Sequence, residues 1–472
     1  MLSVRLWSVR HARGLRRVYD FFTRHAPLFA PIVRVIGPAR SEAWLKPLEH
    51  GTKQLMFDCQ MCGQCVLSST GLACPMNCAK QMRNGPCGGV RADGGCEVKP
   101  EMRCVWIEAT EGAQRIAGEG GKIPAPLLPP LDHTREGKST WIPVVCGDGD
   151  FGKRWKVPAS EPVVAHEAAS FERACNSGRF IVTVEVAPPD SADPSVLIER
   201  AQRFAGLVDA INITDGAGGN CHMSSVAASA VLATHGLTPV YQVACRDRNR
   251  IAIQGDILGA AALGVRNILC LTGDDVSQGD HPQAKPVFDL DSVTLLGITR
   301  GMRDRGEYAS GRKLTTAPNL YLGATINPFV PPYLDRIVNL EKKIAAGAQF
   351  IQTQFCFDVP LLEDFMREVR ARELHKRCRI IVGVGTLGNA KALRWMANHV
   401  PGVHIPETLL QRIAAAADQK MEGKRVCIET IQAVASIEGI AGVHLMGHKN
   451  DEVLAEIITE AKLRQARPLP LH

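Results

Sequence analysis

Half of the sixteen cysteines in this chain fall within one short stretch. They are Cys59, Cys62, Cys65, Cys74, Cys78, Cys87, Cys96 and Cys104. The first three lie two residues apart, and the pair Cys74-Pro75 follows them. Thiolates at this spacing can converge on one centre from a single loop, and thiolates are ligands for zinc and for iron–sulfur clusters. The spacing therefore predicts metal binding at these eight cysteines.

The same spacing leaves the identity of the metal open. A Cys-Pro that closes a run of cysteines is typical of bacterial ferredoxin motifs, although the last gap is longer here. The pairs Cys62/Cys65 and Cys74/Cys78 would equally form a four-thiolate zinc ribbon. Eight cysteines suffice for two sites, so a cluster, a zinc ion or one of each fits. A disulfide framework needs an oxidising compartment, and no secretory segment precedes the cysteines, so we expect a cytoplasmic protein.

The overall composition is that of a soluble globular enzyme. The chain has 472 residues, of which 45% are hydrophobic and 22% charged, enough for one large domain and a small one. No apolar stretch reaches the length that spans a bilayer. The net charge of +7 is modest, and no basic run recurs beside aromatic residues, which argues against nucleic-acid binding.

The first 40 residues are rich in arginine and contain one acid, Asp20. The arginines are Arg5, Arg10, Arg13, Arg16, Arg17, Arg24, Arg34 and Arg40. Such a segment can be a transit peptide, a helix on a membrane surface or a helix that docks on protein. We favour the docking helix, because apolar residues gather on one side and leave the arginines in water. These apolar residues are Leu6, Val9, Leu15, Val18, Phe21 and Phe22.

Four regions follow from these patterns. Residues 1–50 are predicted to form a basic helical extension, helical as far as Pro38, and residues 55–108 the cysteine-rich metal-binding domain. Residues 109–175 are rich in proline and glycine and read as a linker. Residues 176–465 alternate short β-rich runs with amphipathic helices.

Eight apolar runs in the last region are each expected to form a strand buried on both faces. They cover residues 180–189, 208–216, 239–245, 267–274, 320–327, 350–358, 379–385 and 442–447. Eight β/α repeats favour a (β/α)8 TIM barrel over an open doubly wound sheet, which usually stops at fewer strands. The predicted fold is therefore an α/β barrel preceded by a small metal-binding domain and a helical segment.

Polar residues recur at the carboxyl ends of these strands, where a barrel carries its chemistry. Glu185 lies in an apolar run, and a carboxyl group that loses hydration is favoured in its protonated form, which suits a general acid. An ion pair with a barrel arginine is the structural alternative. Gln242, Asn327 and Gln354 can donate and accept hydrogen bonds at the edge of a pterin or flavin ring, although a single glutamine is more often a core residue. Further polar strand-end residues are Thr214, Asp215, Arg246, Arg248, Thr272, Gly273, Asp274, Gln352 and His444.

With these residues in place, the region from about 180 to 460 resembles methylenetetrahydrofolate reductase, a flavin-dependent (β/α)8 barrel. The resemblance rests on Glu-x-x-Pro-Pro at Glu185, on Leu-Thr-Gly-Asp ending at Asp274, and on KKIAAGAQFIQTQFCFD from Lys342 to Asp358. Residues 55–108 resemble a cysteine-rich partner domain that accompanies some bacterial reductases of this family.

The resemblance implies an activity and roles for single residues. The family reduces 5,10-methylenetetrahydrofolate to 5-methyltetrahydrofolate, in one-carbon and methionine metabolism. Glu185 matches the general acid that protonates N10 of the folate, after which flavin delivers a hydride to the 5-iminium cation. Asp274 matches the aspartate between flavin and pterin, and Gln354 matches the glutamine that contacts the pterin.

The resemblance also implies a set of flavin contacts, with FAD as the expected cofactor. They are Thr214, Gln242, Arg248, Gly273, Asp274, Phe288 and Lys343. The sequence departs from the family pattern at two of these strands, because Gln242 replaces a histidine and Thr272 an arginine. Both changes remove potential FAD contacts, so FMN or a flavin-free site are alternatives. Arg248 is a candidate replacement for a lost phosphate contact.

The source of electrons depends on the metal. With an iron–sulfur cluster, electrons could arrive from a redox partner protein; with structural zinc, NAD(P)H is the natural donor. We expect a folate substrate and a homo-oligomer. The alternative functions are a folate-binding methyltransferase or corrinoid-partner barrel without hydride transfer, and a non-catalytic subunit that docks a reductase through its basic N-terminus.

Overall fold

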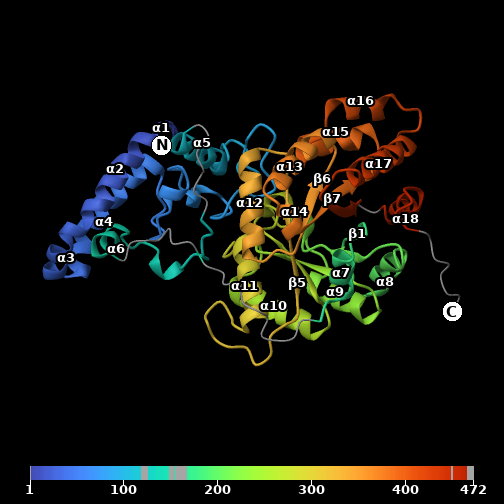
Figure 1. The fold of residues 1–472 in the computed structure, drawn as a ribbon, viewed down its shortest axis with the longest axis horizontal. Coiled ribbons are helices and arrows are strands. Elements are labelled where there is room, and N and C mark those ends of the chain that lie inside the picture. The colour runs from blue at the N-terminus through green and yellow to red at the C-terminus, as the bar shows by residue number, and fades with distance from the viewer. Residues whose placement is uncertain (1, 119–125, 148–154, 156–166, 448–449, 465–472) are drawn as a thin grey trace. The chain divides into compact units, whose positions relative to one another are not determined.

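The computed structural model describes residues 2–118, 126–147, 155, 167–447 and 450–464. The chain divides into two compact units (Figure 1). Unit 1 comprises Met1–Pro86 and Gly94–Lys156, and unit 2 comprises Cys87–Asp93 and Val157–His472. None of the helices in the described ranges is long and apolar enough to cross a membrane.

Unit 2 is built on a closed barrel of eight parallel strands in chain order, which confirms the predicted TIM barrel. The strands are β1 (Ile181–Val186), β2 (Ala210–Ile213), β3 (Pro239–Ala244), β4 (Asn267–Leu271), β5 (Tyr321–Ile326), β6 (Phe350–Phe355), β7 (Arg379–Gly385) and β8 (Ile440–Met446). Each falls within one of the eight predicted runs, apart from the first two residues of β8. Closure is made by β8 pairing with β1, with Thr183 beside His444.

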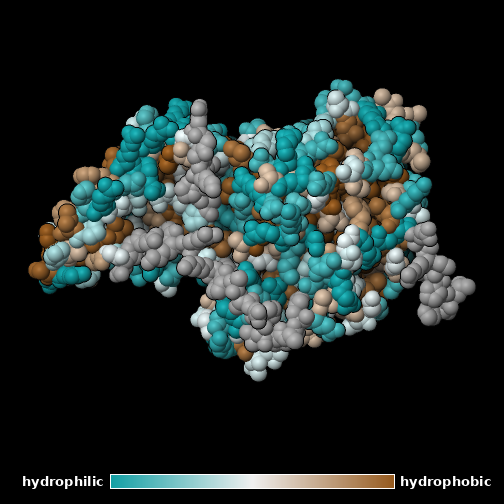
Figure 2. Space-filling model, in the orientation of Figure 1, coloured by the Kyte–Doolittle hydropathy of each residue, from teal (hydrophilic) through white to brown (hydrophobic). Residues whose placement is uncertain are grey.

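Helices surround the barrel, and side-chain caps mark the starts of several of them. They are α7 (Ser170–Asn176), α8 (Ser195–Gln202), α9 (Ser225–Thr234), α10 (Arg250–Ala262), α11 (Ser292–Arg305), α12 (Tyr333–Ala346), α13 (Val359–Ala371), α14 (Leu374–Arg377), α15 (Ala390–His399), α16 (Glu407–Ala415), α17 (Gln419–Ala435) and α18 (Asp451–Glu460). Asn249, Asp291 and Asp358 accept hydrogen bonds from backbone N–H groups in the first turns of α10, α11 and α13. Such caps satisfy N–H groups that have no partner within the helix. Figure 2 shows that the helical face turned to the viewer is largely hydrophilic.

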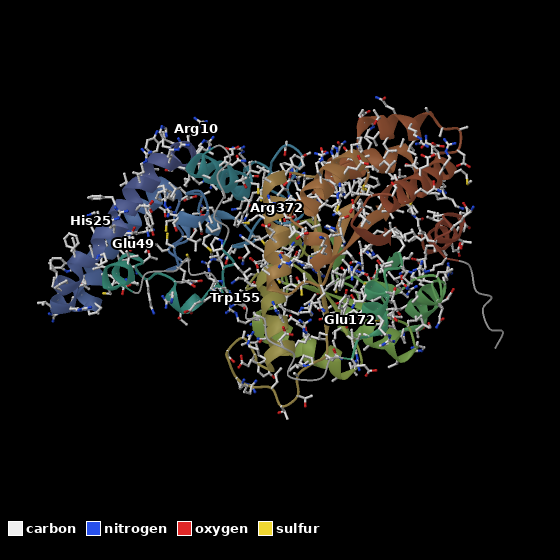
Figure 3. All side chains as sticks on the ribbon, viewed as in Figure 1. Arg10, His25, Glu49, Trp155, Glu172 and Arg372 are labelled. Carbon is white, nitrogen blue, oxygen red and sulfur yellow. The ribbon has the colours of Figure 1, made fainter. Side chains whose placement is uncertain are left out.

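The barrel interior changes from apolar to polar along the strands. Its amino-terminal end is filled by residues such as Ile181 and Phe350, and Phe171 of α7 packs against them. Glu172, next to Phe171, is labelled in Figure 3. Because side chains alternate between the two faces of a strand, the second residue after each of these core positions also points inward. Those positions include Thr183 and Gln352, and they lead toward the carboxyl ends of the strands.

Unit 1 consists of helices that flank an irregular cysteine loop. The helices are α1 (Leu2–Arg10), α2 (Ala12–His25), η1 (Ala26–Phe29), α3 (Ala30–Ile36), α4 (Pro38–Phe57), α5 (Val105–Ala117) and α6 (Trp141–Cys146). The cysteine loop lies between α4 and α5 and contains two short turns, η2 (Leu67–Ser69) and η3 (Pro75–Asn77). Ala12 of α2 packs with Leu67, Leu72 and Cys74 of this loop.

The structure differs from the sequence-based expectation in two places within unit 1. The helical segment was expected to end at Pro38, but a new helix, α4, begins at Pro38 and runs to Phe57. Gly37, at φ 91°, turns the chain, and proline suits the first position of a helix. The region expected as a linker contributes α5, α6 and the buried Leu128 to unit 1.

One piece of the cysteine stretch, Cys87–Asp93, belongs to unit 2. Arg336 of α12 donates to the Cys87 carbonyl over 2.7 Å, and Asn327, after β5, donates to the Gly88 carbonyl over 2.7 Å. Gly402 approaches so closely that a Cβ there would lie 2.2 Å from the Gly88 oxygen. The cysteine stretch therefore does not form one body, and Cys87 is held by barrel residues.

Candidate functional site

Glu185 is the centre of the polar group inside the barrel. It lies near the end of β1, and its side chain is 29% exposed. Gln242 of β3 donates from Nε2 to Glu185 Oε2 over 3.3 Å, and His444 Nε2 of β8 lies 4.0 Å from the same oxygen. Three strands thus converge on one carboxyl oxygen. A carboxyl group held in this way can keep or release a proton at a fixed point.

A buried hydrogen-bonded chain lies behind Glu185. His444 Nδ1 is 2.9 Å from Thr183 Oγ1, and Gln352 Nε2 donates to that hydroxyl oxygen over 3.2 Å. Asn212 Nδ2 in turn donates to Gln352 Oε1 over 2.7 Å. All four side chains are almost fully buried. Because buried polar groups that are fully paired hold one arrangement, this chain fixes His444 beside Glu185.

Asp274 stands at the rim of the barrel between two loops. Its Oδ2 accepts a hydrogen bond from the Gly218 backbone N–H over 2.9 Å, which ties the loop after β4 to the loop after β2. Gly273 precedes it with φ 97°, and a Cβ at this position would lie 2.9 Å from the Cβ of Arg246. Only glycine fits there without a shift, so the direction of Asp274 depends on Gly273.

Two other predicted contact residues lie at the ends of their strands. Thr214 follows β2 and is buried, and no described residue pairs with its Oγ1. A buried hydroxyl without a partner is uncommon in proteins, and a bound group is one way to satisfy it. Gln354 lies in β6, and its Oε1 accepts from the backbone N–H of Phe355 over 3.0 Å.

Phe288 lies in the long connection between β4 and α11. It is buried and has φ 42°, a left-handed conformation that side chains other than glycine rarely adopt. The neighbouring Val287 N–H donates to the Arg246 carbonyl over 2.7 Å, which ties this connection to the loop after β3. Strained backbone of this kind is found preferentially at ligand sites.

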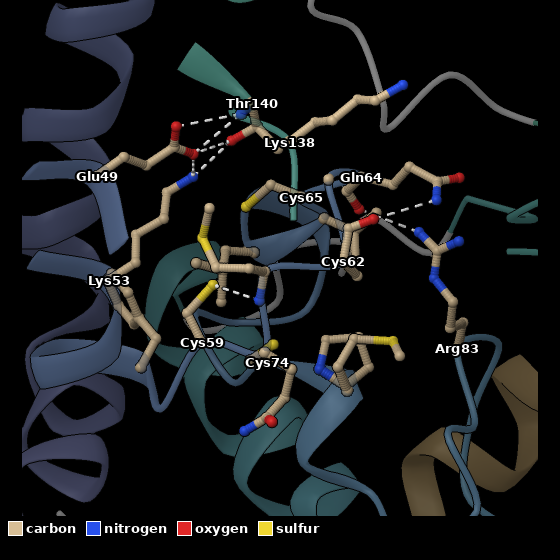
Figure 4. A pocket seen from close by; sticks show the side chains of 18 residues that line it. Glu49, Lys53, Cys59, Cys62, Gln64, Cys65, Cys74, Arg83, Lys138 and Thr140 are labelled. Atoms are coloured by element: carbon tan, nitrogen blue, oxygen red, sulfur yellow. Dashed lines mark hydrogen bonds and ion pairs between the residues drawn. The ribbon is translucent and has the colours of Figure 1, made fainter. Parts of the chain in front are cut away.

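A second candidate site lies in unit 1, where four thiols line one cavity. Figure 4 shows Cys59, Cys62, Cys65 and Cys74 around this cavity, together with Lys53 and Arg83. Arg83 donates to the Gln64 carbonyl over 3.2 Å. The four thiols are the first four of the eight predicted ligands, so loop spacing and cavity agree.

The surroundings of three thiols in this cavity, those of Cys59, Cys62 and Cys74, disfavour the thiolate form. Burial raises the pKa of Cys59 and of Cys62. Burial, and then repulsion from the thiolates of Cys62 and Cys65, raises the pKa of Cys74. Thiolates would therefore need a compensating cation. A bound metal ion supplies that charge, and Lys53 and Arg83 add to it.

The barrel can be assigned to a family by comparison with known proteins. Residues 170–462, which contain all eight strands, match the family described as methylenetetrahydrofolate reductase. The chain belongs to the methylenetetrahydrofolate reductase family. Residues 39–131, which contain the eight cysteines, match a second family described as the methylene-tetrahydrofolate reductase C terminal. In this chain they precede the barrel.

Two relatives with curated names carry the same activity in their names. A probable methylenetetrahydrofolate reductase (NADPH) of Caenorhabditis elegans is 26% identical over 240 residues, 50% of this chain. Methylenetetrahydrofolate reductase 2 of Schizosaccharomyces pombe is 25% identical over 225 residues, 47% of this chain. The matched region spans 34% of the length of each relative.

A solved structure is similar over part of the chain. A Clostridium thermocellum protein, which binds two copies of 5-methyl-5,6,7,8-tetrahydrofolic acid, matches 62% of this chain and 98% of its own. The sequence identity is 15% and the TM-score 0.44.

Two predicted flavin contacts of this reductase-family barrel are engaged elsewhere. Arg248 forms ion pairs with Asp215 and with Asp256 of α10, at 2.8 Å for the latter, and its guanidinium lies 3.4 Å from the Tyr241 hydroxyl. Tyr241 alternates with the inward-facing Gln242, so it points toward the helices. Arg248 therefore lies on the helical side of the sheet and has no contact with Glu185 in the described residues.

Lys343 of α12 is likewise buried against protein. Its Nζ donates to the Thr325 carbonyl over 2.5 Å. Burial, reinforced by repulsion from Arg336, lowers the pKa of Lys343 to about 7. Burial makes the charged form of Lys343 unfavourable, so an anionic ligand would stabilise it. In the structure Lys343 bonds instead to a backbone carbonyl.

The other four predicted cysteine ligands do not line the same cavity. Burial raises the pKa of Cys78, with Cys96 as a neighbouring thiol, and the Cys104 backbone N–H donates to Gly94. Cys87 lies in unit 2. In the described part of the chain, no three His, Cys, Asp or Glu side chains have the arrangement of a metal centre. Cys59, Cys62, Cys65 and Cys74 lie close enough to line one cavity. Coordination of a metal such as zinc would bring every sulfur to about 2.3 Å from one point.

Sequence reasoning gave no role to the buried chain of Thr183, Asn212, Gln352 and His444. The two-residue period carried a signal for three of them, because Thr183, Asn212 and Gln352 each lie two positions after an inward-facing core residue. Gln352 and His444 stood out as polar strand-end residues. The pairing among strands that are far apart in sequence is what gives them a common place.

Proposed function

We propose that this chain reduces 5,10-methylenetetrahydrofolate to 5-methyltetrahydrofolate with a bound flavin. The observation that carries the proposal is the carboxyl group of Glu185, held inside a barrel of this family by Gln242 and close to His444. The family match supports the reaction class.

Glu185 would hold the proton that opens the five-membered ring of the substrate at N10. Gln242 donates to Oε2, and this bond limits the rotation of the carboxyl group that would face the substrate. Opening the ring leaves a positive charge on the substrate, which the carboxylate of Asp274 at the rim would stabilise. Gln354 would contact the pterin through its side-chain amide. The tie from Asp274 to Gly218 keeps that charge in place.

The residues at the carboxyl end of the barrel fit a flavin. Thr214 offers a buried hydroxyl that has no partner among the described residues, and Phe288 presents a buried aromatic ring in a strained loop. Gly273 lets the chain turn closely against Arg246 and so directs Asp274 to the rim. The flavin, when bound, supplies the hydride that reduces the opened substrate. FAD is the proposed cofactor, and FMN is the alternative, because Arg248 and Lys343 bond to protein groups.

We also propose a metal site at Cys59, Cys62, Cys65 and Cys74. The donor set is all thiolate, and the cavity that these cysteines share is also lined by the cationic residues Lys53, Arg83 and Lys138. An iron–sulfur cluster would accept electrons from a redox partner protein, and zinc would leave NAD(P)H as the direct donor. Thiolate ligands suit both metals, so the residues alone do not choose between them.

The reaction is tested by reversing it. Purified chain with bound flavin is mixed, without oxygen, with 5-methyltetrahydrofolate, and the visible flavin band is followed. Bleaching of the band, with formation of methylenetetrahydrofolate, is expected. A flavin-loaded protein that binds the folate without bleaching would instead be a methyltransferase-type barrel.

The metal is tested by elemental analysis on the same sample. Iron with acid-labile sulfide and a broad visible absorbance identifies a cluster, whereas zinc alone identifies a structural site. Protein purified with neither metal, and unable to take up either, would contradict the proposed site.

A further inference from the structure

Helix α3 and the preceding turn η1 carry their large apolar side chains on the outside. Leu28 and Phe29 of η1 are 73% and 55% exposed, and Ile32 and Val35 of α3 are 55% and 88% exposed. Ile36 is also exposed. These five residues are called the apolar tip. An amphipathic helix normally buries its larger apolar residues, so the tip is arranged in the opposite way.

The buried side of this segment carries smaller apolar side chains than the exposed side. Ala26, Ala30 and Val33 pack with Ile142 and Val145 of α6. This packing fixes the orientation of α3 within unit 1. The exposure of the apolar tip therefore follows from a packed core beneath it.

Neighbouring helices extend the same surface. Val18, Phe21 and Phe22 of α2 and Trp44 and Leu48 of α4 are exposed as well. Figure 2 shows hydrophobic residues gathered at the end of unit 1 where these helices meet. Twelve of the twenty exposed large hydrophobic side chains in the described residues lie between residues 7 and 55. So large an apolar patch marks an interaction surface.

The surface around the tip is positively charged. Exposed arginines without an ion-pair partner in the described residues are Arg10, Arg17, Arg24, Arg34 and Arg40. Arg10 and the partly exposed His25 are labelled in Figure 3, on the outer side of α1 and α2. Only Asp20 and Glu42 are acidic in the first 48 residues.

Both of these acids are already engaged. Asp20 pairs with Arg16 at 2.8 Å, and Glu42 accepts from the Ser139 backbone N–H over 2.9 Å. The partner of the tip must therefore be apolar and anionic at once. A second copy of this chain is disfavoured, because a symmetric contact would bring the same arginines face to face.

We infer that the apolar tip of unit 1 binds the surface of a lipid bilayer that contains anionic lipid. Apolar and aromatic side chains ringed by arginines are the pattern of helices that lie in the membrane interface, and aromatic rings such as Trp44 prefer that depth. Arginine guanidiniums pair well with lipid phosphates. The exposed apolar side chains are spread over η1, α2, α3 and α4, so they fit an extended soft surface better than one small ligand. The inference is independent of the reaction proposed for the barrel.

The test is sedimentation of the full chain with vesicles of two compositions. Vesicles of phosphatidylcholine with phosphatidylglycerol should bring down the protein, and vesicles of phosphatidylcholine alone should bring down far less. Binding should weaken as salt is added, because charge attraction to the surface is screened.

Two sets of variants address the two components of the surface. Ile32→Ser with Val35→Ser should reduce binding at least tenfold, whereas Ile251→Ser, at a 78% exposed position of α10, should leave it unchanged. Changing Arg24, Arg34 and Arg40 to Gln should weaken binding on the order of 100-fold. Changing Arg367, Lys391 and Arg394 of the barrel helices to Gln removes the same charge and should have little effect.

All variants alter exposed side chains, and an unchanged thermal unfolding midpoint verifies that they fold. The inference is overturned if anionic vesicles recover no more protein than neutral ones, or if the Ile32 and Val35 variant binds like the parent. It is also overturned if the parent doubles its mass in solution and that variant does not, which would assign the tip to a second copy.

Discussion

The barrel and the cysteine loop position their chemical groups by different means. In the barrel, strand pairing alone brings Glu185, Gln242 and His444 to one point, because inward-facing residues recur every second position. In the described cysteine loop, none of the thiols lies on a strand. Gln64 exchanges two hydrogen bonds with the backbone of Asp132, and similar ties anchor the loop.

This contrast indicates what holds the residues of each site in a fixed arrangement. A barrel site needs no ligand to be ordered, because the sheet that carries it is the core of the fold. A loop site whose thiols have raised pKa values gains its order from whatever neutralises them. We therefore expect the loop to depend on its ligand and the barrel not to.

The largest effect is expected from removing thiols of the cavity. Cys62→Ser with Cys74→Ser should abolish metal binding and unfold the loop, since structural zinc in small modules contributes about 10–16 kcal/mol of apparent binding free energy. Elemental analysis and the thermal unfolding of unit 1 measure the two losses. The barrel transition should remain.

The matched control is Cys146→Ser, which changes a cysteine of α6 outside the cavity. It should keep both metal and stability. If the double variant melts like this control, the loop is ordered by its side-chain ties alone and the contrast with the barrel fails.

Next in size is the loss of the proposed acid. Glu185→Gln should lower turnover by about 10²–10⁴, because a positioned proton donor contributes that much, and flavin should stay bound. Steady-state and single-turnover folate reduction measure the effect. Glu172→Gln, in α7 at the amino-terminal end of the barrel, is the control and should turn over normally. An active Glu185 variant would move the acid role to another residue.

Sequence alone predicted the barrel because its signals are local and periodic. Eight apolar runs gave the eight strands, and the end of each run marked the end of the barrel that carries Glu185 and Asp274. For residues that follow a strand, it was harder to predict whether the side chain points into the barrel or toward the helices. Arg248 lies four residues after β3 and turns toward Asp256 of α10, a choice that depends on where the helix packs.

In the cysteine stretch, spacing predicted neighbours but not the limits of the group. Cys59, Cys62, Cys65 and Cys74 share a cavity, as their short separations suggest. Cys87 belongs with the barrel, because Asn327 holds the adjoining Gly88 from 239 residues away. No local pattern contains that contact.

Two buried carboxylates of unit 1 allow a finer test of how its loops are tied. Glu49 accepts from Lys53 at 2.6 Å and from the Thr140 N–H at 3.1 Å, whereas Glu108 accepts from Arg5 at 2.9 Å and its Oε2 has no partner in the described residues. Near neutral pH, Glu49→Gln should lower the unfolding free energy by about 3–5 kcal/mol. Glu108→Gln should cost less, about 1–2 kcal/mol.

The pH dependence of stability should differ in sign between the two. Burial opposes charge on Glu49, but Lys53 and hydrogen bonds outweigh it and lower its pKa below 4.5, so its contribution is lost as the pH falls. Burial outweighs Arg5 at Glu108 and raises its pKa, so its contribution is full below 4.5 and lost as the pH rises through the raised value. Denaturant unfolding at several pH values compares each variant with the parent. If the unfolding free energy of the two variants, each relative to the parent, changed equally with pH, the two carboxylates would have the same environment.

The smallest effect is expected at His444, which acts through Glu185. His444→Phe removes the ring nitrogen 4.0 Å from Oε2 and the bond to Thr183, so turnover should fall roughly tenfold, well below the loss at Glu185 itself. The fall should appear in kcat with KM little changed, because the ring acts on the position of Glu185 and not on substrate binding. His444→Gln, which can still bond to Thr183, should recover part of kcat. A normal kcat in the His444→Phe variant would make His444 a packing residue, and the barrel would then fix its acid through Gln242 alone.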